Sequence, residues 1–128
     1  MIKRLCWLAL FILSISVLYY SWLKEPSFAG ESYMPLWLVQ WSDEYGRLRT
    51  AVPFVCLGLL GNQFHASRVK AFLLFMSYSF LLVLLAEIGQ FFLPQRFPDW
   101  ADVVCALGGG ILGYSIQYLF GILKKSYE

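Results

Sequence analysis

The strongest constraint in this sequence is a series of apolar runs, each bounded by short charged segments. The runs cover residues 5–23, 48–64, 71–93 and 103–123. About 20 apolar residues in a helix cross the roughly 30 Å hydrocarbon core of a bilayer. Hydrophobic residues make up 59% of the 128-residue chain and charged residues 14%, which lies outside the range of ordinary soluble domains. The sequence therefore predicts an all-α integral membrane protein with four transmembrane helices.

The first run, residues 5–23, is predicted to be a retained transmembrane helix. Lys3 and Arg4 precede it, and the tyrosines and tryptophan at its end resemble an aromatic belt at a membrane interface. The basic start, together with the small residues of "SFAG" after the run, also resembles a secretory signal peptide with its cleavage site. The long apolar core and the bulky aromatic end favour retention, and cleavage stays the alternative.

The second run is preceded by a predicted helix start. Ser42, followed by Asp43 and Glu44, has the pattern of an N-cap residue with acidic residues in the first turn. The apolar part that follows, residues 48–64, is short, and Pro53 is expected to kink it.

The distribution of charge predicts the side of the membrane that each loop faces. With a cytoplasmic N-terminus, the cytoplasmic segments carry Lys3, Arg4, Arg68, Lys70, Lys124 and Lys125 against Glu128. The opposite side then carries Lys24, Arg47, Arg49 and Arg96 against Glu25, Glu31, Asp43, Glu44, Asp99 and Asp102. Because basic residues concentrate in cytoplasmic loops, we predict that both termini are cytoplasmic. In the outer loop, residues 24–47, "YMPLWLVQW" forms either a short interfacial helix or a loop packed over the bundle.

A polar cluster interrupts the end of the third run, in "LLAEIGQFFLPQRFPDWAD". Glu87 and Gln90 are three residues apart and share one face of the predicted helix. A carboxylate within a span is costly unless it is paired, protonated or in contact with water. Arg96 is its nearest candidate partner in sequence, and Arg47 and Arg49 are the others. The charges therefore either pin helices together or form a ligand or headgroup site.

Residues next to and within the fourth run have structural interpretations. Asp99 is predicted to cap the helix that follows, and Asp102 lies at its third position, where negative charge suits the helix dipole. Small residues four apart, in a G-x-x-x-G pattern, are typical of close helix packing. The predicted packing positions are Gly109 and Gly113 on the fourth run and Gly58 and Gly61 on the second.

No pattern in the sequence indicates a metal, a cofactor or a nucleic acid. Cys6, Cys56 and Cys105 all lie in apolar runs without C-x-x-C spacing, so they are interpreted as small buried apolar side chains. The basic residues lie at segment ends and form no patch for nucleic acid. No nucleophile–base pair is visible, which favours a non-enzymatic role, although carboxylates near an arginine can perform acid–base chemistry.

The segment from Glu87 to Gly113 resembles the VanZ-like family of small multi-span bacterial membrane proteins. The family signature is a Glu, a Gln three residues on, a Pro and an Arg in a short turn, then Asp, and finally a helix with an Asn and two glycines four residues apart. The matching positions here are Glu87, Gln90, Pro94, Arg96, Asp99, Asp102, Gly109 and Gly113. The family's Asn falls on Ala106, and of its upstream Asp-Lys and His motif only Asp43 matches, with Glu44 and Arg47 in the other positions.

The resemblance implies a protein of the bacterial inner or plasma membrane. The best-known member of the family is associated with low-level resistance to the glycopeptide teicoplanin. The resemblance implies a fold and a compartment but supplies no reaction.

We therefore expect a single membrane domain, residues 1–128, with a polar pocket on its extracytoplasmic side. The pocket is expected to bind a lipid or a lipid-linked envelope precursor. Its candidate residues are Asp43, Arg47, Glu87, Gln90, Arg96 and Asp102. Two alternatives stay open: an assembly protein that binds another membrane protein through the glycine face of the fourth helix, and a membrane enzyme that acts on a lipid-linked substrate.

Overall fold

A computed structural model of the chain describes residues 1–23, 27–64 and 67–128. All regular elements in these ranges are helical, which confirms the predicted all-α class. In chain order they are α1 (Ile2–Ser21), η1 (Phe28–Gly30), α2 (Leu36–Glu44), α3 (Gly46–Leu59), η2 (Gly61–Phe64), α4 (Arg68–Gln90) and α5 (Trp100–Tyr127). Lys24 and Glu25, which entered the charge comparison, and the start of the predicted outer loop lie outside the described residues.

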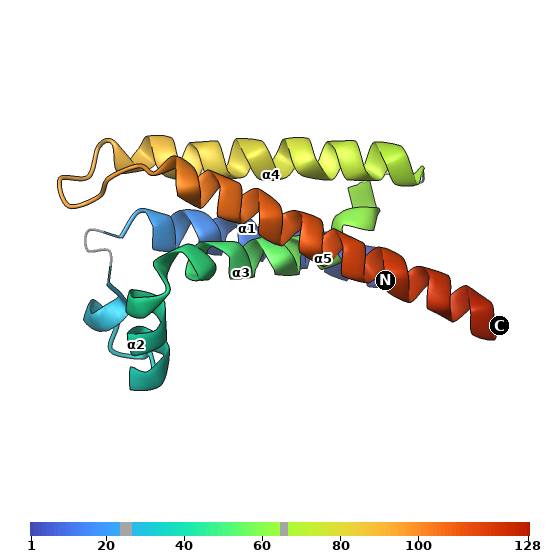
Figure 1. Cartoon of the computed structure of the whole chain (residues 1–128), viewed down its shortest axis with the longest axis horizontal. Helices are drawn as coiled ribbons and strands as arrows, with labels where there is room; N and C mark the ends of the chain where they lie inside the picture. The colour runs from blue at the N-terminus through green and yellow to red at the C-terminus, as the bar shows by residue number, and fades with distance from the viewer. Residues whose placement is uncertain (24–26, 65–66) are drawn as a thin grey trace.

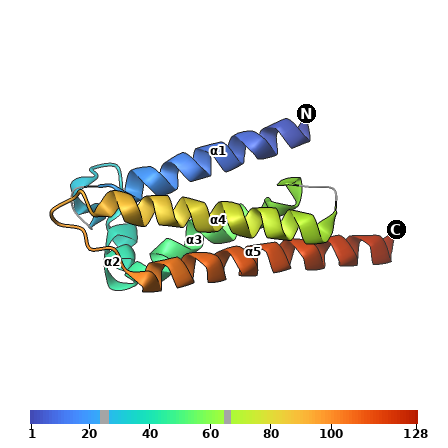
Figure 2. The same ribbon diagram turned by 90° about the horizontal axis from the view of Figure 1, so that it is seen from above.

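The helices α1, α3, α4 and α5 run along the long axis of the molecule, and α2 lies across one end of them (Figure 1). Both termini lie at the opposite end, beside the start of α4 (Figures 1 and 2). The end that carries α2 also holds the loop from α4 to α5 and the end of α1. We call these two the α2 end and the terminal end.

Three helices in the described ranges are long and apolar enough to cross a membrane, namely α1, α4 and α5. The second predicted span, residues 48–64, does not form one helix of that length. There the chain forms the 14-residue helix α3, which rises about 21 Å, and then the short 3-10 helix η2. Three of the four predicted spans are therefore helices that could cross a membrane by their length and composition.

The predicted helix start at Ser42 is wrong. Ser42 is fully buried in the last turn of α2, where its hydroxyl donates to the Val39 carbonyl at 2.9 Å. Helix α2 begins earlier, after Pro35, whose φ of −61° is already suited to a helix start. Tyr45 then separates α2 from α3. The polar residues that looked like a cap therefore end one helix and do not begin the next.

Helices α3 and α5 make the most extensive contact between elements in the described chain. A Cβ atom on Gly109 would collide with the carbonyl oxygen of Ala51, and one on Gly113 would collide with that of Val55. A Cβ atom on Gly58 would meet the carbonyl oxygen of Gly110 in the same way. The two helices therefore touch through their backbones, which only glycine at these positions permits.

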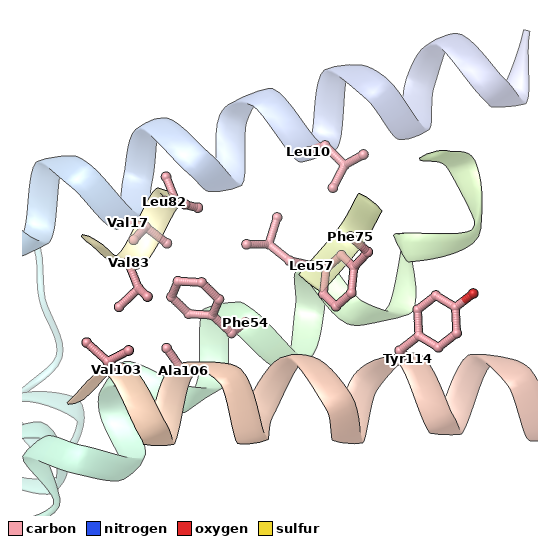
Figure 3. Close-up of a cluster of buried hydrophobic side chains, with 10 residues drawn as sticks. All are labelled: Leu10, Val17, Phe54, Leu57, Phe75, Leu82, Val83, Val103, Ala106 and Tyr114. Atoms are coloured by element: carbon pink, nitrogen blue, oxygen red, sulfur yellow. The ribbon is translucent and has the colours of Figure 1, made fainter. Parts of the chain in front are cut away.

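A single apolar core joins the four long helices (Figure 3). Its buried members are Leu10 and Val17 of α1, Phe54 and Leu57 of α3, Phe75, Leu82 and Val83 of α4, and Val103, Ala106 and Tyr114 of α5. Large apolar side chains also cover the outer faces of the helices, for example Phe11, Leu81 and Val104. An apolar surface outside an apolar core suits a protein surrounded by lipid.

Gly113→Leu is predicted to destabilise the fold, because the new side chain has to push α3 away from α5. We expect the free energy of unfolding to fall by at least about 2 kcal/mol, as in severe overpacking. The change should appear as a lower melting temperature in detergent. The matched control is Gly108→Leu, also on α5, where an added Cβ meets nothing within 4 Å. Equal melting temperatures for the two variants would contradict the backbone contact.

Candidate functional site

The α2 end contains a cavity of about 470 Å³ that is lined by polar and apolar side chains. Its polar residues come from the end of α4, the α4–α5 loop and the starts of α3 and α5. They include Arg49, Thr50, Glu87, Gln90, Arg96, Asp99 and Asp102. Four of the six pocket residues expected from the sequence are among them: Glu87, Gln90, Arg96 and Asp102.

Arg96 holds the α4–α5 loop against the end of α1. Its Nε donates to the carbonyl of Leu23 at 2.9 Å, and a terminal guanidinium nitrogen donates to the carbonyl of Tyr20 at 3.1 Å. The last carbonyls of a helix have no partner inside the helix and carry the negative end of its dipole. Arg96 therefore supplies both hydrogen bonds and a positive charge to the end of α1.

The charge of Arg96 is also influenced by its surroundings, since the residue is only 9% exposed. Burial lowers the pKa of the guanidinium, and the nearby charge of Arg49 lowers it further, whereas Glu87 and Asp102 raise it. Arginine is effectively always protonated in proteins. The cavity therefore contains a cation that contacts protein carbonyls.

Glu87 and Asp99 organise the start of α5. Glu87 Oε2 accepts a hydrogen bond from the backbone N–H of Asp99 at 3.0 Å. The carboxylate of Asp99 accepts one from the N–H of Ala101, also at 3.0 Å, as an N-cap residue does. Both groups satisfy backbone donors at a helix start, so part of the polar cluster has a structural role.

Arg49 occupies the place that the sequence interpretation assigned to Arg47. Arg49 lines the cavity, with its guanidinium carbon 4.8 Å from the centroid of the Phe28 ring. Arg47 lines a neighbouring hollow and forms an ion pair with Asp99 at 3.8 Å. Two residues along a helix turn the side chain by about 200°, so only one of the two arginines can face the cavity.

Asp43 does not join the cavity. Its carboxylate accepts a hydrogen bond from the Ser27 hydroxyl at 2.8 Å on the surface. Helix α2, which carries Asp43, lies across the end of the bundle (Figure 1), and Asp43 is not among the described residues that line the cavity. Of the described residues, Arg49 therefore lines the cavity, and Arg47 and Asp43 do not.

The sequence interpretation missed a contact between Trp22 and α4. The indole nitrogen of Trp22 donates to the carbonyl of Ala86 at 3.0 Å. Its ring fills the space beside Gly89, where an added Cβ would collide with it. The sequence signal for this contact is Gly89, between Glu87 and Gln90. A glycine inside an apolar helix indicates that a neighbouring group approaches the helix closely at that position.

Gln90 is a polar residue that lines the cavity. The residue is only 6% exposed, and none of the side-chain hydrogen bonds found among the described residues involves its amide. A carboxamide can make up to four hydrogen bonds. Because Gln90 lines the cavity, its amide could form hydrogen bonds with a molecule bound there.

The cavity combines charge with an apolar wall. Among the described residues, two guanidinium groups and three carboxylates line it together with Val17, Phe28, Phe54 and Val83. Over the described residues, no group of three histidine, cysteine or acidic side chains is placed to hold a metal ion. Such a lining suits a ligand with one apolar part and another that donates and accepts hydrogen bonds.

A comparison with protein families gives one match, to the VanZ/LLP1 family model over residues 5–121. This chain belongs to the VanZ/LLP1 family. The match extends over α1 to α5 and therefore includes the cavity and the glycine contact between α3 and α5. No curated protein and no solved structure matches the chain. The family resemblance of the segment from Glu87 to Gly113 is thus confirmed over most of the chain.

Arg96→Gln is predicted to destabilise the protein, because it removes the charged donors that hold the end of α1. Hydrogen bonds to charged groups contribute roughly 1.5–3 kcal/mol each to stability, so we expect the free energy of unfolding to fall by about 3 kcal/mol. Arg47→Gln is the matched control, since the side chain of Arg47 is 71% exposed. A thermal melt in detergent measures both variants, and an unchanged melting temperature for Arg96→Gln would refute the proposed contact role.

Proposed function

We propose that this VanZ/LLP1-family membrane protein binds an amphiphilic envelope component in the cavity at the α2 end. The ligand is a lipid or a lipid-linked cell-envelope precursor with an anionic or sugar-bearing head. The observation that carries the proposal is a 470 Å³ cavity with charged and apolar walls at one end of helices able to span a membrane. Ionisable groups at such a place are costly, and function is the usual reason that they persist.

Three side chains are proposed to contact the ligand, and three to build the site. Arg49 meets an anionic group, and Gln90 and Asp102 bind hydroxyls or amides of the head. Arg96, Glu87 and Asp99 fix the ends of α1 and α5, as their hydrogen bonds to the backbone indicate. The apolar wall would accept the first part of a lipid chain. The role is binding, and no step of bond formation is included.

The proposed topology has four crossings with both termini in the cytoplasm of a bacterial cell. Both termini lie at the same end of the bundle (Figure 2), which supports an even number of crossings. Helix α3 with η2 then makes the fourth crossing, packed against α5. The basic residues near the termini support a cytoplasmic terminal end, so the cavity opens on the extracytoplasmic side of the inner or plasma membrane.

The assembly alternative receives less support. In the structure, Gly109 and Gly113 are covered by the backbone of α3. The glycine face of α5 is therefore already occupied within the chain and is not a free surface for another membrane protein. An enzymatic role on a lipid-linked substrate has no specific observation in its favour among the described residues.

The topology predicts which engineered cysteines a membrane-impermeant maleimide can reach. In a chain whose three native cysteines are replaced by alanine, Ser32→Cys should be labelled in intact bacterial cells. Ser126→Cys should be labelled only after the cells are opened. Both positions are exposed in the structure, so accessibility within the protein does not differ. Labelling of Ser126→Cys in intact cells would contradict a cytoplasmic C-terminus.

Gln90→Leu is predicted to remove ligand binding without loss of stability. Leucine has a similar size, and the substitution leaves no described protein partner unsatisfied. Lipid that co-purifies with the protein, measured by mass spectrometry, should fall about tenfold, the effect of losing one or two hydrogen bonds. Where the parent protein lowers the susceptibility of a bacterial strain to a teicoplanin-type glycopeptide, cells that carry Gln90→Leu in its place should be susceptible.

Gln40→Leu on the exposed surface of α2 is the control for Gln90→Leu and should behave like the parent protein. Arg49→Gln should reduce the recovered lipid to a similar degree. If Gln90→Leu keeps the melting temperature, the lipid content and the susceptibility of the parent, the cavity is not a ligand site.

A further inference from the structure

The terminal end of the bundle contains a second hollow, of about 310 Å³, between the start of α4 and the second half of α5. Its lining residues belong to η2, the start of α4 and the second half of α5, and the start of α4 and the end of α5 lie at the end of the bundle opposite α2 (Figures 1 and 2). The polar side chains of its lining include Asn62, Arg68, Gln117, Tyr118 and Lys125. Two of them are basic, and no described residue that lines the hollow is acidic.

The hollow is built by one face of α5. Tyr114, Tyr118, Gly121 and Lys125 follow one another at spacings of three or four residues, so they lie along one side of the helix. The hydroxyl of Tyr114 donates to the Arg68 carbonyl at 3.0 Å and anchors the start of α4. Gly121 leaves the space open, since an added Cβ there would meet nothing within 4 Å.

The basic groups of the hollow are suited to an anion. The guanidinium carbon of Arg68 lies 5.0 Å from the centroid of the Tyr118 ring, a cation–π contact that uses the face of the guanidinium group. Donation by its N–H groups occurs in the guanidinium plane and is compatible with this contact. The first turn of α4 contains no acidic residue, so the positive end of its dipole adds to the charge of Arg68 and Lys125.

We propose that this hollow binds the phosphate group of an anionic phospholipid in the leaflet at the terminal end. Arg68 would bind two phosphate oxygens, Lys125 would add a point charge, and Gln117 and Asn62 would donate from their amides. The hollow lies between the ends of two helices that can span a membrane, where basic pockets bind lipid headgroups. Exposed apolar side chains on the same helices, such as Val69 and Ile122, offer a surface to the acyl chains.

The phosphate chemistry alone would also fit a soluble phosphate. The position among exposed apolar side chains favours the lipid, because inorganic phosphate gains nothing from an apolar surface. The proposal does not depend on the function proposed for the α2 end, since the two sites share no residue.

Full-length protein in nanodiscs tests the proposal. Binding is titrated with phosphatidylglycerol in a background of phosphatidylcholine and read out by native mass spectrometry. The parent protein should retain a defined number of phosphatidylglycerol molecules. Gly121→Leu, whose added Cβ meets nothing within 4 Å and whose side chain should occupy the hollow, should lose one of them. Arg68→Gln should weaken its binding by about tenfold, the effect of one charge-assisted contact.

Two control variants separate a defined site from general attraction to negative lipid. Lys124→Gln removes a neighbouring exposed charge that does not line the hollow, and Gly108→Leu adds a side chain in open space elsewhere on α5. Both should bind phosphatidylglycerol like the parent. Equal losses in Lys124→Gln and Arg68→Gln, or no change in Gly121→Leu, would overturn the proposal. Displacement of the lipid by millimolar inorganic phosphate would assign the hollow to a soluble anion and would also overturn it.

Discussion

The backbone contact between α3 and α5 is the interaction on which the remaining structure depends. Helix α3 is too short to resemble an independent span, and Gly109 and Gly113 let it lie directly on α5. This contact sets the rotation of α3 and so directs Arg49 and Thr50 toward Asp102, where the Thr50 hydroxyl lies 3.5 Å from the carboxylate. The cavity at the α2 end is thus a consequence of glycine packing one to three turns away.

The polar cluster serves two purposes that the structure separates. Arg96, Glu87 and Asp99 contact backbone groups at the end of α1 and the start of α5. Helix ends inside an apolar surrounding need such partners, because water is absent there to supply them. Gln90 makes no side-chain hydrogen bond among the described residues, and it lines the cavity together with Arg49. A rigid frame with a few polar groups that face a cavity is typical of a selective binding site.

Local sequence spacing was sufficient for some features and not for others. The Glu87 and Gln90 pair, the cap at Asp99 and the small residues of α5 depend on neighbours within one or two helical turns. The choice between Arg47 and Arg49 depends on how α3 is rotated, which distant residues on α5 decide. Spacing within α3 could have helped, since Arg49 and Pro53 lie one turn apart on the cavity face. The contact of Trp22 with α4 joins residues more than 60 positions apart. Gly89 indicates that something approaches α4 closely at this position, but local spacing cannot identify Trp22 as that neighbour.

The two hollows should select different ligands because their charges differ. Three carboxylates line the α2-end cavity beside two arginines, so a simple anionic headgroup would meet repulsion there as well as attraction. A head rich in hydroxyl or amide groups can use both kinds of side chain, which favours a glycosylated or peptide-bearing lipid. Among the described residues, the lining of the terminal-end hollow includes Arg68 and Lys125 and no carboxylate, so an ordinary anionic phospholipid would fit it better. Specificity is a difference between affinities, and under the proposed functions the carboxylates of the first site would provide that difference by excluding the ligand of the second.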